Sequence, residues 1–172
     1  MTDDRRTDEV TSETSVLLEA ISVLMDWDYH PEVRATLRSV AGNGTTILTS
    51  IVALPSAETW TITYPDDSAE RRDADGIYTL RLRGAVVESS PRDPRRVPPA
   101  LWLIFPMTAL IWGRPRDGWK MIGAVRTGNL TEISLEHVEH PDVLAQLTVD
   151  HDQRMATKFV TPFDSMELLN IG

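Results

Sequence analysis

Four histidines are the side chains best suited to acid–base or metal chemistry in this sequence. His137 and His140 are three residues apart, with Glu136 and Glu139 beside them. On an extended strand that spacing places the two imidazoles on opposite faces. We therefore expect a solvated strand end, with metal ligation as the alternative. His151 stands between two aspartates in a predicted turn, and we expect it at the surface.

A second short motif, Asp73-x-Asp75-Gly76, has the spacing of a calcium loop. The bidentate glutamate of such a loop would fall at position 82, which is Leu82. The chain has no cysteine, which excludes disulfides, thiolate metal sites and cysteine nucleophiles. It also has no glycine-rich phosphate loop and no nucleophile elbow. We therefore predict a protein that is not an enzyme, with no catalytic residue, no metal and no cofactor.

Large apolar side chains are the remaining candidates, for binding instead of reaction. Trp60 lies on a predicted strand, and Trp102 and Trp112 lie in the most apolar stretch of the chain. Side chains of this kind line ligand pockets, and they also fill ordinary cores, so both interpretations stay open. The predicted ligand-binding residues are Trp60, Ile62, Leu101, Phe105, Leu110 and Trp112.

The apolar stretch covers residues 97–113, and Thr108 is its one polar side chain between residues 100 and 112. It is too short to cross a bilayer, which takes about 20 residues. Pro98 and Pro99 suit a helix start and Pro106 interrupts it, so we predict a helix over residues 100–105 and a second turn or helix over residues 107–112. The stretch is a core plug, a lid or liner of a cavity, or a membrane-surface anchor.

Residues 13–28 predict an N-terminal helix that is apolar on most sides and must lie against a sheet. Residues 1–12 are polar and acidic, and we expect a disordered tail there. Most of the rest of the chain alternates between polar and apolar residues in short runs divided by turns, which predicts an antiparallel meander. The predicted strands are residues 33–40, 46–54, 59–64, 69–72, 77–83, 85–88, 119–126, 130–138, 143–149, 155–161 and 166–171.

A sheet of that size curls, and two apolar segments are available to cover it. We predict an α+β fold: a single strongly curved antiparallel sheet of about ten strands, a half-barrel. The N-terminal helix and the central apolar helical segment lie on its concave face.

This order of elements, with four short segments, resembles the LolA-like family of outer-membrane lipoprotein carriers. The segments are residues 56–65 around Trp60, Asp75-Gly76, Pro99-Ala100-Leu101 and residues 147–158. The resemblance implies one half-barrel domain over residues 13–172. It also implies a protein that holds acyl chains or acts as a sensor or binding module of the cell envelope.

The net charge of -9 is concentrated at the N-terminus, where residues 1–32 hold nine acidic residues and two arginines. This distribution disfavours nucleic acid as a partner, because phosphate binding requires a basic face. With no export signal or transmembrane segment visible, we expect a cytoplasmic protein. We predict that it binds an apolar small molecule or lipid between sheet and helices. The alternative is a protein–protein interaction or regulatory module with a solid core.

Overall fold

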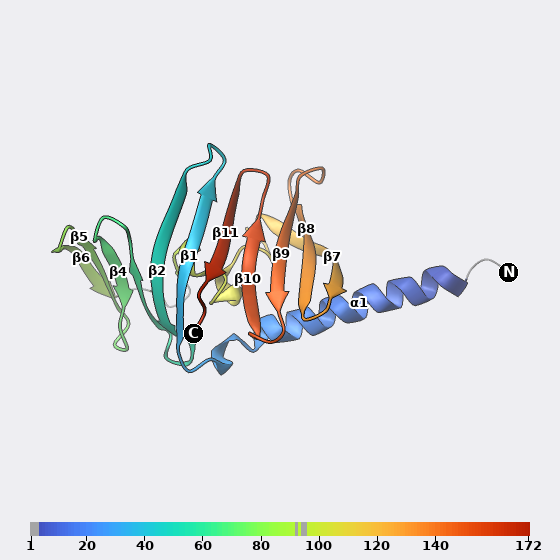
Figure 1. Ribbon diagram of the computed structural model, residues 1–172, viewed down its shortest axis with the longest axis horizontal. Coiled ribbons are helices and arrows are strands. Elements are labelled where there is room, and N and C mark those ends of the chain that lie inside the picture. The colour runs from blue at the N-terminus through green and yellow to red at the C-terminus, as the bar shows by residue number, and fades with distance from the viewer. Residues whose placement is uncertain (1–3, 92, 94–95) are drawn as a thin grey trace.

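The structure is a computed structural model that describes residues 4–91, 93 and 96–172, with the backbone alone for residues 4–12. Within these residues, one α-helix precedes eleven strands that form a single sheet (Figure 1). The helical elements are α1 (Asp4–Met25) and the 3-10 turns η1 (Trp27–Tyr29), η2 (Pro55–Ala57), η3 (Pro99–Leu101) and η4 (Pro106–Thr108). The strands are β1 (Val33–Ala41), β2 (Thr46–Leu54), β3 (Thr59–Thr63), β4 (Ala69–Arg72), β5 (Ile77–Leu82), β6 (Ala85–Pro91), β7 (Trp119–Thr127), β8 (Leu130–His137), β9 (Leu144–Asp150), β10 (Met155–Val160) and β11 (Asp164–Leu169).

The sheet consists of two meanders joined through the first and the last strand. Its order is β6-β5-β4-β3-β2-β1-β11-β10-β9-β8-β7, and every pair of neighbours is antiparallel. The pairing of β1 with β11 forms a seam in the middle, where Thr36 lies opposite Leu169 and Ala41 opposite Asp164. The predicted open antiparallel sheet with an N-terminal helix is confirmed, with eleven strands in place of about ten, and its shape is consistent with a half-barrel.

The connection from β6 to β7 has to pass from one edge of the sheet to the other. These edges are ten strand spacings apart, or about 48 Å along the sheet at roughly 4.8 Å per spacing. The described part of this connection, residues 96–118, runs behind the strands in Figure 1. A segment that crosses the inner face of a sheet is buried, and this explains why the connection is the most apolar part of the chain.

The helix predicted over residues 100–105 is wrong, although the burial of the segment is confirmed. The connection contains only the short turns η3 and η4, each starting at a proline. Phe105 has φ -114° and ψ 64°, because a residue before proline is driven out of the α-helical region. The described backbone after η4 returns to an extended conformation at Ala109. Leu101, Leu103, Ile104, Phe105, Ala109 and Ile111 are nevertheless buried, so these side chains are not available to a membrane surface.

Helix α1 packs on the inner face at the β7 end of the sheet. It contacts β7, β8, β9 and β10 and also η4 of the connection, so helix and connection lie side by side on one face. Ala20 and Leu24 are fully buried, whereas Leu18 and Met25 are exposed, so the covered stripe is narrower than the sequence predicts. The tail expected over residues 1–12 lies outside the residues whose side chains are described, and its disorder stays a prediction.

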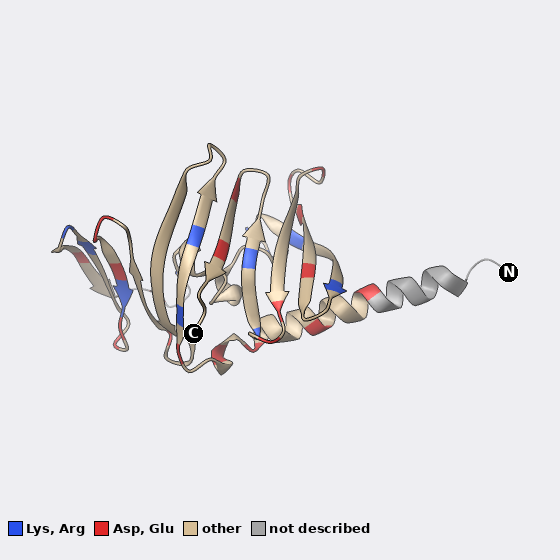
Figure 2. Cartoon of the chain, viewed as in Figure 1, with Lys and Arg blue, Asp and Glu red and all other residues tan. Residues whose placement is uncertain are grey.

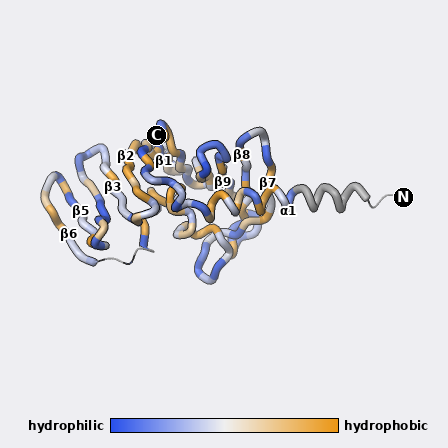
Figure 3. Tube along the Cα trace, turned by 90° about the horizontal axis from the view of Figure 1, so that it is seen from below, coloured by the Kyte–Doolittle hydropathy of each residue, from blue (hydrophilic) through white to orange (hydrophobic). Residues whose placement is uncertain are grey.

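Strands β1, β3, β8 and β9 alternate as the sequence predicts, whereas β6 has no buried side chain. On β1, Val33, Ala35 and Leu37 face inward between the more exposed Arg34 and Thr36. Figure 3 shows hydrophobic residues in orange and hydrophilic residues in blue mixed along the sheet, and in Figure 1 the β4–β6 end is turned relative to the rest of the sheet. Basic and acidic residues are interspersed over the strands in Figure 2. No helix in the described part of the chain is long and apolar enough to span a membrane.

Candidate ligand pocket

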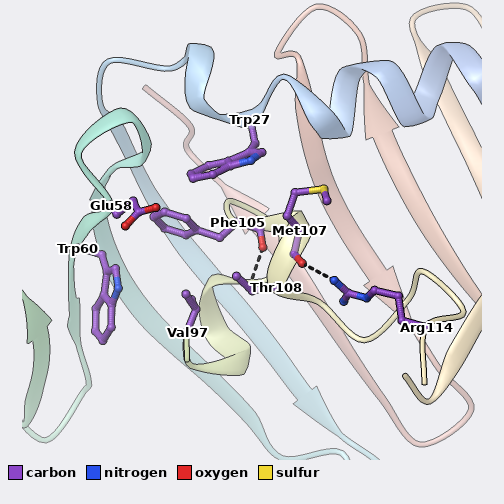
Figure 4. A pocket seen from close by; sticks show the side chains of 8 residues that line it. All are labelled: Trp27, Glu58, Trp60, Val97, Phe105, Met107, Thr108 and Arg114. Carbon is purple, nitrogen blue, oxygen red and sulfur yellow. Dashed lines mark hydrogen bonds between the residues drawn. The ribbon is translucent and has the colours of Figure 1, made fainter. Parts of the chain in front are cut away.

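An open pocket lies where the connection diverges from the sheet near β3. Its volume is ≈ 570 Å³, within the range of roughly 300–1,000 Å³ found for small-molecule sites. Apolar and aromatic side chains form most of its wall (Figure 4). The lining residues are Trp27, Glu58, Trp60, Val97, Phe105, Met107, Thr108 and Arg114.

Aromatic rings from three different elements meet at this pocket. Trp27 follows the end of α1, and its ring centroid lies 5.3 Å from that of Phe105, which precedes η4. Trp60 on β3 packs against Tyr78 on β5, with 6.2 Å between ring centroids. Pairs at these distances are attractive beyond the area that they bury, so the aromatic walls are firmly placed.

The wall formed by the connection is held by hydrogen bonds within the loop itself. Arg114 donates through Nη1 to the carbonyl oxygen of Met107 at 3.0 Å and through Nη2 to that of Ala109 at 2.8 Å. Thr108 Oγ1 donates to the carbonyl oxygen of Phe105 at 2.8 Å, and Trp112 Nε1 donates to that of Pro106 at 2.8 Å. These bonds fix a segment that has little regular secondary structure.

The end of the pocket at the sheet contains a charged group. Trp60 and Arg72 lie opposite each other on β3 and β4 and are buried on the same inner face. Arg72 Nη1 donates to the carbonyl oxygen of Glu58 at 2.5 Å. The Glu58 carboxylate, which lines the pocket, is 3.9 Å from Arg72 Nη2 and is half exposed. A guanidinium group therefore lies beside the tryptophan that lines this end of the pocket.

A second polar cluster lies farther along the same face. Glu70 accepts hydrogen bonds from the Tyr64 hydroxyl at 2.6 Å and the Tyr78 hydroxyl at 2.9 Å. Burial, followed by the hydrogen bond to Glu70, raises the pKa of Tyr64 above its ordinary value of 10.0. Both oxygens of Glu70 are thus engaged with tyrosines, one oxygen with each.

The structure brings two of the six predicted ligand-binding residues to this pocket, namely Trp60 and Phe105. Ile62 and Leu101 have no exposed surface and belong to the core. Leu110 is exposed, and Trp112 is half-buried with its N–H bonded to Pro106, so neither lines the cavity. The lining residues that the sequence argument missed include Trp27 and Glu58, which turns at the ends of α1 and η2 carry to the site. The only feature of the sequence that could have indicated a role in the pocket was the large indole side chain of Trp27 at the end of the predicted helix.

Most of the space between the connection and the sheet is filled. A gap of only ≈ 10 Å³ remains beneath residues 102–111, where Leu103 and Ile111 meet Leu147, Phe159 and Met166. That space is about the minimum for one water molecule. Among the described residues, the space expected between the connection and the sheet is open toward β3, whereas the connection packs closely against Leu147, Phe159 and Met166 of β9 to β11.

The histidine prediction needs a correction, and the calcium-loop motif has a structural explanation. Strand β8 ends at His137, so His140 lies in the following turn and its ring stacks on that of His137 with 5.1 Å between centroids. The prediction that the two imidazoles lie on opposite faces is therefore wrong.

In the motif with the spacing of a calcium loop, Asp73 Oδ1 accepts the backbone N–H groups of Asp75 and Ile77, which is the function of an aspartate in a turn. No group of three or more His, Asp or Glu residues in the described part of the chain could hold a metal ion.

Comparisons with known proteins identify the fold. No protein-family model matches the chain, and no curated protein matches its sequence. An uncharacterised conserved protein from Thermus thermophilus has a similar structure, with a TM-score of 0.56 and 10% sequence identity over 91% of this chain and 86% of that one. The similarity shows that the two chains share a fold, and at this identity it shows nothing further.

Two further structural matches are weaker, and one of them carries the family name suggested by the sequence. A LolA superfamily protein from Nitrosomonas europaea has a TM-score of 0.36 and 7% identity over 88% of this chain and 92% of that one. The Pseudomonas aeruginosa MucA/MucB complex has a TM-score of 0.42 and 13% identity over 90% of this chain and 56% of that one. The LolA superfamily name agrees with the family that the sequence resembles, but similarities at these TM-scores carry no argument on superfamily, ligand or partner.

Proposed function

We propose that this protein is a binding protein that holds an apolar or lipid-like small molecule in the pocket beside β3. The observation that carries the proposal is the cavity of ≈ 570 Å³ with Trp27, Trp60 and Phe105 in its wall. Each aromatic side chain offers a large apolar surface to a bound hydrocarbon. Met107 adds a flexible thioether side chain that adapts to the shape of the occupant.

Binding is proposed without any chemical step. The titratable groups at the pocket are Glu58, Arg114 and the adjacent Arg72, and the two arginines are engaged with carbonyl or carboxylate oxygens of the protein. The described residues bring no nucleophile with a neighbouring base to this wall. The expected absence of enzymatic activity and the expected cytoplasmic location stay predictions.

A displacement experiment tests the proposal. Anilinonaphthalene sulfonate is bound to the full chain, and its fluorescence is followed while dodecanoic acid is added. Met107→Trp places a larger side chain in the pocket and is expected to weaken binding of both compounds at least tenfold. Leu110→Trp is the matched control, because Leu110 is also exposed on the connection but does not line the pocket. Equal binding by the two variants contradicts the proposal.

The alternative function, a protein-interaction module, is favoured by one feature. Strand β6 pairs with β5 on one side and has no strand on its other side within the described residues. Val86 and Val87 on this edge are exposed, and an edge of this kind accepts an extended peptide as an additional strand. Light scattering with size-exclusion chromatography tests this function, since Val86→Lys is expected to dissociate any complex formed through the edge.

A further inference from the structure

Two buried N–H donors without acceptors lie next to each other at the sheet end of the pocket. Trp60 is 2% exposed and Arg72 is 9% exposed, and the two are direct neighbours across β3 and β4. Trp60 Nε1 and Arg72 Nε have no hydrogen-bond partner among the described residues. Most buried polar groups in proteins are paired, so two adjacent donors without acceptors indicate a position for an acceptor from outside the chain.

The carboxylates nearby do not supply that acceptor. Glu70 is on the same face of β4 as Arg72, but its two oxygens accept from Tyr64 and Tyr78. Glu58 Oε2 is 3.9 Å from Arg72 Nη2, which is beyond hydrogen-bond distance. Its side chain is half exposed and therefore compensates the buried guanidinium only weakly.

The two residues lie at or next to the wall of the pocket, because Trp60 lines it and Arg72 is the neighbour of Trp60 across β3 and β4. Trp60 lines the cavity, and in Figure 4 the nitrogen of its indole is on the edge of the ring that faces Val97 and Phe105. Arg72 lies between Glu58 and the turn from β4 to β5. A Cβ added to Gly76 in that turn would be 3.4 Å from Arg72 Nη2. The two donor atoms are shielded from solvent, whereas the Glu58 side chain beside Arg72 is half exposed.

We propose that the ligand is an amphiphile with a carboxylate head group, which binds at Arg72 and Trp60 in place of the Glu58 carboxylate. Its tail lies along Trp27, Phe105 and Met107. One anion then accepts from both donors and compensates the charge of Arg72, which a neutral head group does not do. This inference rests on the proposed function and names the chemical class of the ligand.

Three compounds with the same tail separate the head-group chemistry from the binding of the tail. Dodecanoic acid, dodecanol and dodecylamine are titrated into the full chain by calorimetry, each below its aggregation concentration. The carboxylate is expected to bind about ten- to a hundredfold more tightly than the alcohol, because hydrogen bonds to charged groups are the strong ones. Acetate, which lacks the tail, is expected not to compete at comparable concentrations.

Four variants test which residues produce the preference for the carboxylate over the alcohol. Trp60→Phe keeps an aromatic ring and removes the N–H, and it is expected to reduce the preference for the acid about fivefold. Arg72→Met is expected to abolish the preference. Arg71→Met is its control, because Arg71 is the exposed neighbour on the opposite face of β4. Glu58→Gln removes the competing carboxylate and is expected to strengthen binding of the acid severalfold more than that of the alcohol.

The outcomes distinguish this inference from the proposed function. Equal binding of acid and alcohol, tightest binding of the amine, or equal effects of Arg71→Met and Arg72→Met overturns the head-group assignment while binding in the pocket stands. If Arg72→Met does not fold, the comparison of Trp60→Phe and Glu58→Gln with the unmodified chain decides the matter alone. If none of the three dodecyl compounds binds, the proposed function and this inference both fail.

Discussion

Arg114 Nε lies 3.0 Å from Asp117 Oδ2, and this ion pair holds the loop that forms one wall of the pocket. Asp117 is buried, and the same oxygen accepts from the backbone N–H groups of Trp112 at 2.9 Å and Arg114 at 3.1 Å. Its removal leaves these donors without an acceptor.

Asp117→Ala is therefore expected to lower the free energy of unfolding by about 2–3 kcal/mol, and to weaken ligand binding through the loosened wall. Urea unfolding measures the first effect and displacement of anilinonaphthalene sulfonate the second. Asp142→Ala, at an exposed turn between β8 and β9, is the control and is expected to change stability by about 0.5 kcal/mol or less. A loss of similar size in both variants contradicts the anchoring role of Asp117.

Two leucines of the connection test whether this segment is a structural core. Leu101 has no exposed surface, whereas Leu110 is 40% exposed. Leu101→Ala is expected to cost about 2–5 kcal/mol, since it leaves a cavity beneath the sheet. Leu110→Ala is expected to cost about 1 kcal/mol or less. Chemical denaturation of both variants measures the difference, and equal costs show that the segment does not pack as described.

The raised pKa of Tyr64 predicts that the protein loses stability at alkaline pH. Burial and the Glu70 hydrogen bond raise the pKa of Tyr64 above 10.0, so the folded state favours the neutral phenol. This contribution is complete below the unfolded pKa, near 10, and is lost as the pH rises through the raised folded pKa. Urea unfolding between about pH 8 and 11 is expected to show a steeper loss for the unmodified chain than for Tyr64→Phe. If the free energy of unfolding falls equally with pH in the two proteins, Tyr64 is not the group responsible.

The turn at Gly42, between β1 and β2, lies close to the backbone of the turn between β10 and β11. A Cβ at Gly42 would lie 2.6 Å from the carbonyl oxygen of Phe163, which belongs to the turn between β10 and β11. Gly42→Ala is expected to cost about 1–3 kcal/mol, because backbone has to move. Gly123→Ala is the control, since a Cβ there meets no atom within 4 Å. Thermal unfolding measures both, and a stable Gly42→Ala variant excludes the contact.

The strands could be predicted from the sequence because each depends on a local pattern. Alternation on β1 and β3 marks one buried face, and Gly42, Asn43 and Gly44 mark the hairpin between β1 and β2. Asn43 Oδ1 accepts the backbone N–H of Thr45 at 2.9 Å, so the turn chemistry is local as well. Side-chain period and turn residues act over a few positions, which is the range at which a single sequence is informative.

The connection and the pocket could be predicted only in part, because their structure depends on distant contacts. A short apolar run does not distinguish a helix from irregular buried backbone, and Pro99 and Pro106 here start isolated turns. Trp60 and Phe105 were identified by size and position, whereas Trp27 and Glu58 reach the pocket from other elements. The two unpaired donors arise from the register of β3 with β4, which the sequence does not reveal.

The seam between β1 and β11 has a consequence for how the molecule assembles. Each meander grows from contacts between neighbours in sequence, but the bond between the meanders joins Thr36 to Leu169, across most of the chain. Pairings at such separation carry a large loop-closure entropy and slow folding. We therefore expect this pairing to form late in folding, and during synthesis β1 has no partner on that side until residues 164–169 have left the ribosome.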